Sequence, residues 1–226
     1  MYFSRITLNN RAQFSSGFWK VFRDPYTLHK SIWKIFGDKA DRKRDFLYRY
    51  DLIDGRPLMY SVSDRLPEKE IDLWNTESKI YNPQIKAGMA LSFILRANPI
   101  RTKRDEKGKQ HRHDVVMEEK KQIKGYDSSG GVKKTLALLM QEEGSKWISA
   151  RTEKNGFAIK PDQIRVESYR QHRFIKGKGK KQINISTLDF IGLLTVNDPE
   201  LFLGTLYNGI GPAKGFGCGM MMIKRI

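Results

Sequence analysis

The chain of 226 residues carries 42 lysines and arginines against 25 aspartates and glutamates, a formal net charge of +17. Its 39% hydrophobic and 30% charged content exclude a disordered chain. No apolar stretch approaches the ~20 residues that span a bilayer, the amino terminus lacks the pattern of a signal peptide, and one cysteine excludes an internal disulfide. We expect a cytoplasmic protein with an anionic partner, for which nucleic acid is favoured over a membrane surface or an acidic protein.

The first half of the chain has the order of elements typical of a ferredoxin-like fold. The patterns predict strands at 4–8, 44–52, 58–63 and 89–96, and helices at 25–36 and 67–74. Pro25 suits the first position of a helix, and Asp54-Gly55 is a strong signal for a hairpin turn. The resulting order is β-α-β-β-α-β.

The second half follows the same order with weaker patterns. It predicts strands at 113–117, 164–174, 182–194 and 220–223, and helices at 131–143 and 199–208. The sequence therefore predicts an α+β protein built from two tandem ferredoxin-like (RRM-like, βαββαβ) modules. We place the amino-terminal module at residues 1–99 and the carboxyl-terminal module at residues 100–226.

The predicted helix at 25–36 carries a candidate pair of catalytic side chains. At about 100° per residue, one face is formed by Leu28, Ile32, Ile35 and Phe36. Tyr26 and His29, three residues apart, are neighbours at the border between this core face and solvent. A histidine with an ordinary pKa of ~6.5 can act there as general acid or base, Tyr26 could hold a hydroxyl or phosphate, and Lys30 could offset phosphate charge. The alternative is a histidine hydrogen-bonded at the edge of the core.

The chemistry that this pair suits is cleavage of RNA by its own 2′-hydroxyl. Because the nucleophile is already part of the substrate, the protein supplies proton transfer and charge stabilisation. The sequence shows no acidic cluster of the two-metal nuclease type. We therefore expect no metal site and no cofactor.

A glycine-rich segment at residues 209–219 precedes the last predicted strand. Glycine allows positive φ and close backbone approach, so successive N–H groups can converge on an anion, for which a nucleic-acid phosphate is the candidate. An ordinary glycine-rich turn is the alternative. Basic residues concentrate in two further tracts, at 101–113 and at 170–181. His111 and His113 in the first tract are expected to contact phosphate or solvent rather than a metal.

Four segments spread over the chain resemble one known family. They are Met1-Tyr2-Phe3-Ser4-Arg5, Pro25-Tyr26-Thr27-Leu28-His29-Lys30, Leu95-Arg96-Ala97-Asn98-Pro99 and the glycine-rich segment. By their order and spacing, the chain is identified as a member of the CasE family, the CRISPR-RNA-processing endoribonucleases of type I-E Cascade systems.

The resemblance implies metal-independent cleavage of precursor CRISPR RNA at the base of each repeat hairpin, leaving a 2′,3′-cyclic phosphate and a 5′-hydroxyl. It implies that His29 is the catalytic histidine, that Tyr26 is its partner, and that Lys30 assists them. The partners it implies are the repeat hairpin RNA, as precursor and as retained product, and the other Cascade subunits.

The residues that we expect to bind RNA are basic or lie in the glycine-rich segment: Lys34, Arg96, Arg101, Arg170, Arg173, Lys176, Lys178, Lys180, Lys181, Gly209, Gly211, Lys214, Gly215 and Gly217. By the resemblance, the tract at 170–181 forms a basic hairpin that enters the groove of the RNA stem. Two alternatives to a nuclease share these features, a non-catalytic RNA-binding scaffold and a ribosome-associated RNA-binding protein. Only the pairing of Tyr26 with His29 favours catalysis.

Overall fold

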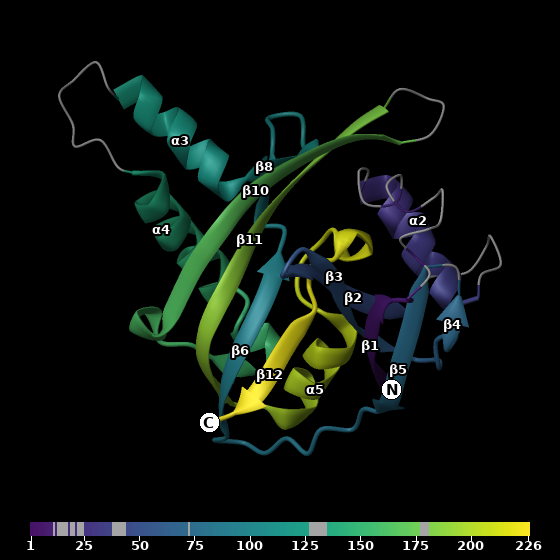
Figure 1. Cartoon of the computed structure of the whole chain (residues 1–226). Helices are drawn as coiled ribbons and strands as arrows, with labels where there is room; N and C mark the ends of the chain where they lie inside the picture. The colour runs from purple at the N-terminus through teal and green to yellow at the C-terminus, as the bar shows by residue number, and fades with distance from the viewer. Residues whose placement is uncertain are drawn as a thin grey trace.

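The protein is built around two antiparallel sheets that lie side by side (Figure 1). The structure, a computed structural model, describes residues 1–10, 12, 18, 21, 25–37, 44–71, 73–126, 135–176 and 181–226. It describes only the backbone of residues 25, 124–126, 174–176 and 181. None of the helices in these ranges is long and apolar enough to cross a membrane.

The first sheet has the order β2-β3-β1-β5-β4. Its strands are β1 (Tyr2–Leu8), β2 (Phe46–Ile53), β3 (Arg56–Ser63), β4 (Glu70–Ile71) and β5 (Trp74–Ile80). Helix α2 (Pro25–Ile35) packs on this sheet through the predicted core face, where Ile32 and Ile35 are fully buried. The predicted turn between β2 and β3 is confirmed, since Asp54 and Gly55 both have positive φ.

The second sheet has the order β10-β11-β6-β12, and β9 pairs at the edge of β11. Its strands are β6 (Ala90–Ala97), β9 (Phe157–Ala158), β10 (Ile164–Lys176), β11 (Lys181–Val196) and β12 (Met221–Arg225). The helices are α3 (Val115–Tyr126), α4 (Leu136–Ser149) and α5 (Pro199–Asn208). A separate hairpin is formed by β7 (Ile100–Arg104) and β8 (Gln110–Asp114). The long β10–β11 hairpin extends from this sheet toward α2 (Figure 1).

The two sheets repeat one strand order, because β2-β3-β1-β5 and β10-β11-β6-β12 correspond strand by strand with antiparallel neighbours. This is the strand order of the ferredoxin-like fold, so the predicted class of two tandem ferredoxin-like units is confirmed. In the first unit, the described residues between β3 and β5 form the short strand β4 instead of the second helix. The predicted place of residues 89–96 is wrong, because β6 pairs with β11 and β12 of the second sheet. The fourth strand of the first unit is β5, which the sequence did not predict. We propose that the units divide within residues 81–89 rather than at 99.

Three other predicted elements differ from the structure. The predicted helix at 67–74 is replaced by β4 and the start of β5. The predicted strand at 113–117 ends at Asp114, because the carboxylate of Asp114 accepts the N–H groups of Val116 and Met117 and so starts α3. Helix α4 begins at Leu136, after Thr135 as its cap, and residues 131–134 of the predicted helix lie outside the described residues.

Candidate active site

Tyr26 and His29 are neighbours on α2, at the border between its core face and solvent, as the helical spacing predicts. Both side chains are half-buried, and their rings lie 6.3 Å apart at 20°. Lys30 is exposed, with its ammonium group 4.3 Å from the centre of the Tyr26 ring. Lys34 is also exposed one turn further on. The helix therefore presents a histidine, a phenol and cationic groups along one border.

The glycine loop, residues 209–219, reaches this border from the other unit. It follows α5, whose first turn is capped by the carboxylate of Asp198, and it contains a single turn of helix at Lys214–Phe216. That turn puts the ring of Phe216 against the ring of His29, with centres 5.2 Å apart and planes at 22°. Trp33 packs edge-on against His29 at 5.7 Å. The imidazole is thus held between one aromatic ring of its own helix and one of the loop.

A hydrogen bond to the loop determines which nitrogen of His29 carries a proton. Nδ1 of His29 lies 2.5 Å from the carbonyl oxygen of Gly215. A carbonyl oxygen can only accept, so Nδ1 is the donor in this bond. In the neutral ring the lone pair is then on Nε2, where it can take a proton from a substrate hydroxyl. The loop therefore provides a carbonyl that orients the histidine.

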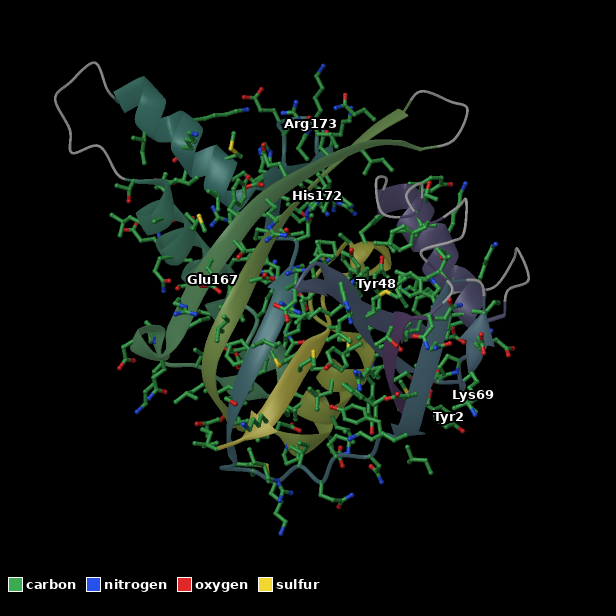
Figure 2. The ribbon with its side chains drawn as sticks, in the orientation of Figure 1. Tyr2, Tyr48, Lys69, Glu167, His172 and Arg173 are labelled. Carbon is green, nitrogen blue, oxygen red and sulfur yellow. The ribbon has the colours of Figure 1, made fainter. Side chains whose placement is uncertain are left out.

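Tyr48, on β2, fixes the same carbonyl from the other side. Its hydroxyl donates to the Gly215 oxygen over 2.9 Å, and only 3% of the residue is exposed. Burial raises the pKa of Tyr48 well above its usual range, so the hydroxyl stays protonated and remains a donor. In Figure 2, Tyr48 is labelled between the β10–β11 hairpin and α2. The Gly215 carbonyl thus joins β2 to α2 through two donors.

The close approach of the loop requires glycine at two positions. A Cβ atom at Gly215 would lie 3.3 Å from Cε1 of His29, tighter than ordinary van der Waals contact. Gly217 has a positive φ, and a Cβ there would lie 3.3 Å from the Tyr48 ring. Gly209 and Gly211 also have positive φ and lie at the start of the loop, away from His29. The loop does not turn all its N–H groups outward, because those of Ile210 and Phe216 donate to carbonyls within the loop and that of Gly219 donates to the carbonyl of Arg96.

Two cations lie near the glycine loop. Arg44 Nη1 is 3.9 Å from the position that a Gly215 Cβ would take. Burial lowers the pKa of Arg44, and burial followed by the charge of Arg44 lowers the pKa of Lys214. Lys214 Nζ donates to the carbonyl of Asn208 at the end of α5, which holds it near the loop. A bound phosphate would offset the repulsion between the positive charges of Arg44 and Lys214. Arg44, Tyr48 and Phe216 were not predicted as site residues.

Comparisons with known proteins identify the family and support the fold. A family model described as CRISPR associated protein matches residues 1–225. The Cascade subunit CasE of Escherichia coli K12 is 30% identical over 205 residues, which cover 89% of this chain and 92% of that protein. The chain belongs to the CasE family.

Two further comparisons agree with membership of the CasE family. The CRISPR-associated endoribonuclease Cse3 of Thermus thermophilus is 24% identical over 238 residues, which cover 99% of each chain. A solved structure of Cse3 bound to a 19-nucleotide RNA is similar with a TM-score of 0.71 and 23% identity, covering 99% of this chain and all of that one. The structural likeness supports the tandem ferredoxin-like fold.

One residue that we expected to bind RNA is engaged inside this CasE family protein. The guanidinium group of Arg96 contacts Asp189 at 2.8 Å, Asp51 at 2.9 Å and the carbonyl of Tyr50 at 2.5 Å. Its side chain is 16% exposed. Burial lowers the pKa of Arg96, but the hydrogen bonds and charges of Asp189 and Asp51 offset this and raise it overall. Arg96 therefore links the two sheets, and its contacts favour a structural role.

Three of the other predicted basic residues are described on the surface of the second unit. Arg170 and Arg173 are exposed on β10, and Arg173 is labelled on the upper part of the hairpin in Figure 2. Arg101, on β7, is half-exposed and lies 3.6 Å from Glu143. Lys176 and Lys181 end the two strands, with side chains outside the described part, and Lys178 and Lys180 lie wholly outside the described residues.

The other side chains that could react, Cys218 and His111, have surroundings that indicate structural roles. Cys218 is fully buried, and burial raises the pKa of its thiol to about 12, so its surroundings fit a packing role. His111 Nε2 donates a hydrogen bond to the carboxylate of Asp105 over 2.8 Å on the exposed β7–β8 hairpin. Within the described residues, no group of three histidine, cysteine or acidic side chains is arranged to hold a metal ion.

Proposed function

We propose that this protein is a CRISPR-RNA-processing endoribonuclease that cleaves precursor RNA at the base of each repeat hairpin. Membership of the CasE family supports this, as does the endoribonuclease activity in the name of its relative Cse3. The observation that carries the chemical proposal is the hydrogen bond from His29 Nδ1 to the Gly215 carbonyl. This bond leaves Nε2 as the proton acceptor on the exposed border of the helix.

The proposed reaction uses the 2′-hydroxyl of the nucleotide before the cut as nucleophile. Nε2 of His29 takes its proton, the 2′-oxygen attacks the phosphorus, and the bond from phosphorus to the 5′-oxygen breaks. The products are a 2′,3′-cyclic phosphate and a 5′-hydroxyl, whose oxygen takes up a proton. Tyr26, beside His29, positions the hydroxyl or phosphate, while Lys30, Arg44 and Lys214 offset the charge on the phosphoryl oxygens.

The proposed setting is the cytoplasm, where the mature RNA stays bound and the protein acts as a Cascade subunit, as the name of its relative CasE states for that protein. The predicted basic hairpin around β10 and β11 would hold the RNA stem. Its exposed arginines, Arg170 and Arg173, are placed to contact phosphates.

The experiment that tests the reaction uses a labelled hairpin RNA from a CRISPR repeat of the same genome, in the presence of EDTA. We expect one cut at the base of the stem, a 2′,3′-cyclic phosphate on the upstream product, and no cut when the nucleotide before the bond is 2′-deoxy. Cleavage that requires a divalent metal or that proceeds on the 2′-deoxy RNA would overturn the proposed chemistry. Tight binding without a cut would make the protein a scaffold.

A further inference from the structure

A groove of about 740 Å³ adjoins the candidate active site. It lies between the β10–β11 hairpin, the β7–β8 hairpin and helix α3. The glycine loop closes it with Pro212, Ala213 and Phe216. Phe216 is also the residue whose ring stacks on His29. The groove therefore adjoins the candidate active site, and the Phe216 side chain lines both.

The acidic side chains in the groove already have charge or hydrogen-bond partners within the protein. Glu118 Oε1 accepts a hydrogen bond from Lys103 at 2.6 Å, and that bond is the main cause of the lowered pKa of Glu118. Its other oxygen, Oε2, forms no hydrogen bond with a described residue but lies 3.9 Å from Arg101. Asp114 accepts the hydroxyl of Tyr169 at 2.7 Å with one oxygen and caps α3 with the other. Neither carboxylate therefore needs a cation from a ligand.

The basic side chains in the groove are available to a ligand. Arg112 on β8, Lys121 on α3 and Arg173 on β10 are exposed and form no ion pair with any described residue. In Figure 2, Arg173 and His172 are labelled on the part of the hairpin that borders the groove. The groove thus has positive walls contributed by three separate elements, which suits a chain of phosphates.

The interior of the groove suits nucleotide bases. Met117, Ile183 and Phe216 provide apolar surface on which bases can lie. His172 is half-buried there, and burial followed by the charges of Arg170 and Arg96 lowers its pKa. A neutral imidazole has one donor and one acceptor, so it can form hydrogen bonds with the edge of a base.

The shape of the groove favours unpaired over paired RNA. Its volume is that of a site for a small ligand, and its polar groups converge from several sides. An A-form duplex is contacted across its shallow minor groove and its phosphates, whereas unpaired bases can be splayed into concave sites. We propose that this groove binds the single-stranded RNA that adjoins the cleaved bond at the base of the hairpin. This inference rests on the proposed function and adds a second RNA site to it.

The test compares RNAs that differ only in their unpaired ends. Three labelled hairpins, all 2′-deoxy at the cut site, are a bare hairpin, one with a 5′ extension and one with a 3′ extension. Wild type is compared with the double variant Arg112→Ala, Lys121→Ala. The matched control, Lys160→Ala with Arg165→Ala, also removes two exposed positive charges, from residues outside the groove. Cleavage of the corresponding all-ribose RNA by wild type is measured in the same series.

We expect one extension to tighten binding by wild type about tenfold, and the groove variant to lose this gain while binding the bare hairpin as wild type does. The salt slope for the extended RNA falls by about 1.4 in the groove variant, as for two contacts to single-stranded phosphates. The control variant keeps the gain.

Equal wild-type affinity for all three RNAs, or an equal loss by the groove variant on bare and extended RNA, would overturn the groove site. If wild type still cleaves in that case, the proposed function stands without the groove. If wild type binds the extended RNA but does not cleave the all-ribose RNA, the proposed function fails while the groove site stands.

Discussion

The hydroxyl of Tyr48 provides a sensitive test of how the Gly215 carbonyl orients His29. In Tyr48→Phe the ring stays in its buried place and only the 2.9 Å hydrogen bond is lost. The carbonyl keeps His29 as its second donor, so no buried acceptor is left without a partner. We therefore expect the free energy of unfolding to fall by about 1 kcal/mol, the usual net value of such a bond.

The free energy of this hydrogen bond also sets an upper limit on the effect of Tyr48→Phe on cleavage. If all of it serves to position the carbonyl in the transition state, the single-turnover rate falls about fivefold. The affinity for RNA stays unchanged, because Tyr48 is buried and contacts the loop from within. Urea unfolding and single-turnover cleavage of labelled hairpin RNA measure the two quantities.

The matched control is Tyr60→Phe, on the neighbouring strand β3, because the Tyr60 hydroxyl makes no hydrogen bond with any described residue. We expect both its stability and its cleavage rate to equal those of wild type. A wild-type rate in Tyr48→Phe, despite the lost stability, would refute the positioning role. A loss above a hundredfold would also refute it, because the hydroxyl would then act in the chemistry itself.

Three further predictions concern the glycine loop, the link between the sheets and the hairpin. Gly215→Ala places a methyl group 3.3 Å from the His29 ring, so the cleavage rate falls roughly tenfold with RNA affinity kept. Its control Gly204→Ala, in an open position on α5, is silent in both assays. Arg96→Ala breaks a largely buried ion pair and lowers the free energy of unfolding by about 3 kcal/mol in urea titrations, whereas an effect on RNA affinity alone would contradict its structural role. Arg173→Ala reduces the salt slope of RNA binding by about 0.9, and the same change at Arg165, which pairs with Glu167, leaves the slope intact.

Local sequence patterns predicted the elements whose structure is set locally. The apolar spacing of α2 gave its buried face, and Asp54-Gly55 gave the β2–β3 turn. The strand β5 was missed because its outer half is polar and exposed. The place of β6 in the second sheet could not be read from its own residues, because it depends on pairing with β11, about a hundred residues later.

The candidate site likewise combines features that local sequence predicts with features that only the fold brings together. The pairing of Tyr26 with His29 follows from helical spacing and was predicted. The groups that orient His29 come from other elements of the fold, since Gly215 is 186 positions away in the glycine loop and Tyr48, which bonds the Gly215 carbonyl, lies on β2. Arg96 reads as a surface cation in the sequence, and only the fold brings Asp189, 93 positions away, against it.

The most direct test of the central claim, that His29 is the proton-transfer group, is the behaviour of His29→Ala in two paired assays. One measures the single-turnover cleavage rate at saturating protein, and the other measures the affinity for a 2′-deoxy hairpin that cannot be cut. We predict a fall in rate of about a hundredfold or more, with the affinity nearly unchanged. A rate close to wild type, or an affinity that falls in parallel with the rate, would contradict the assignment of His29 as the catalytic residue.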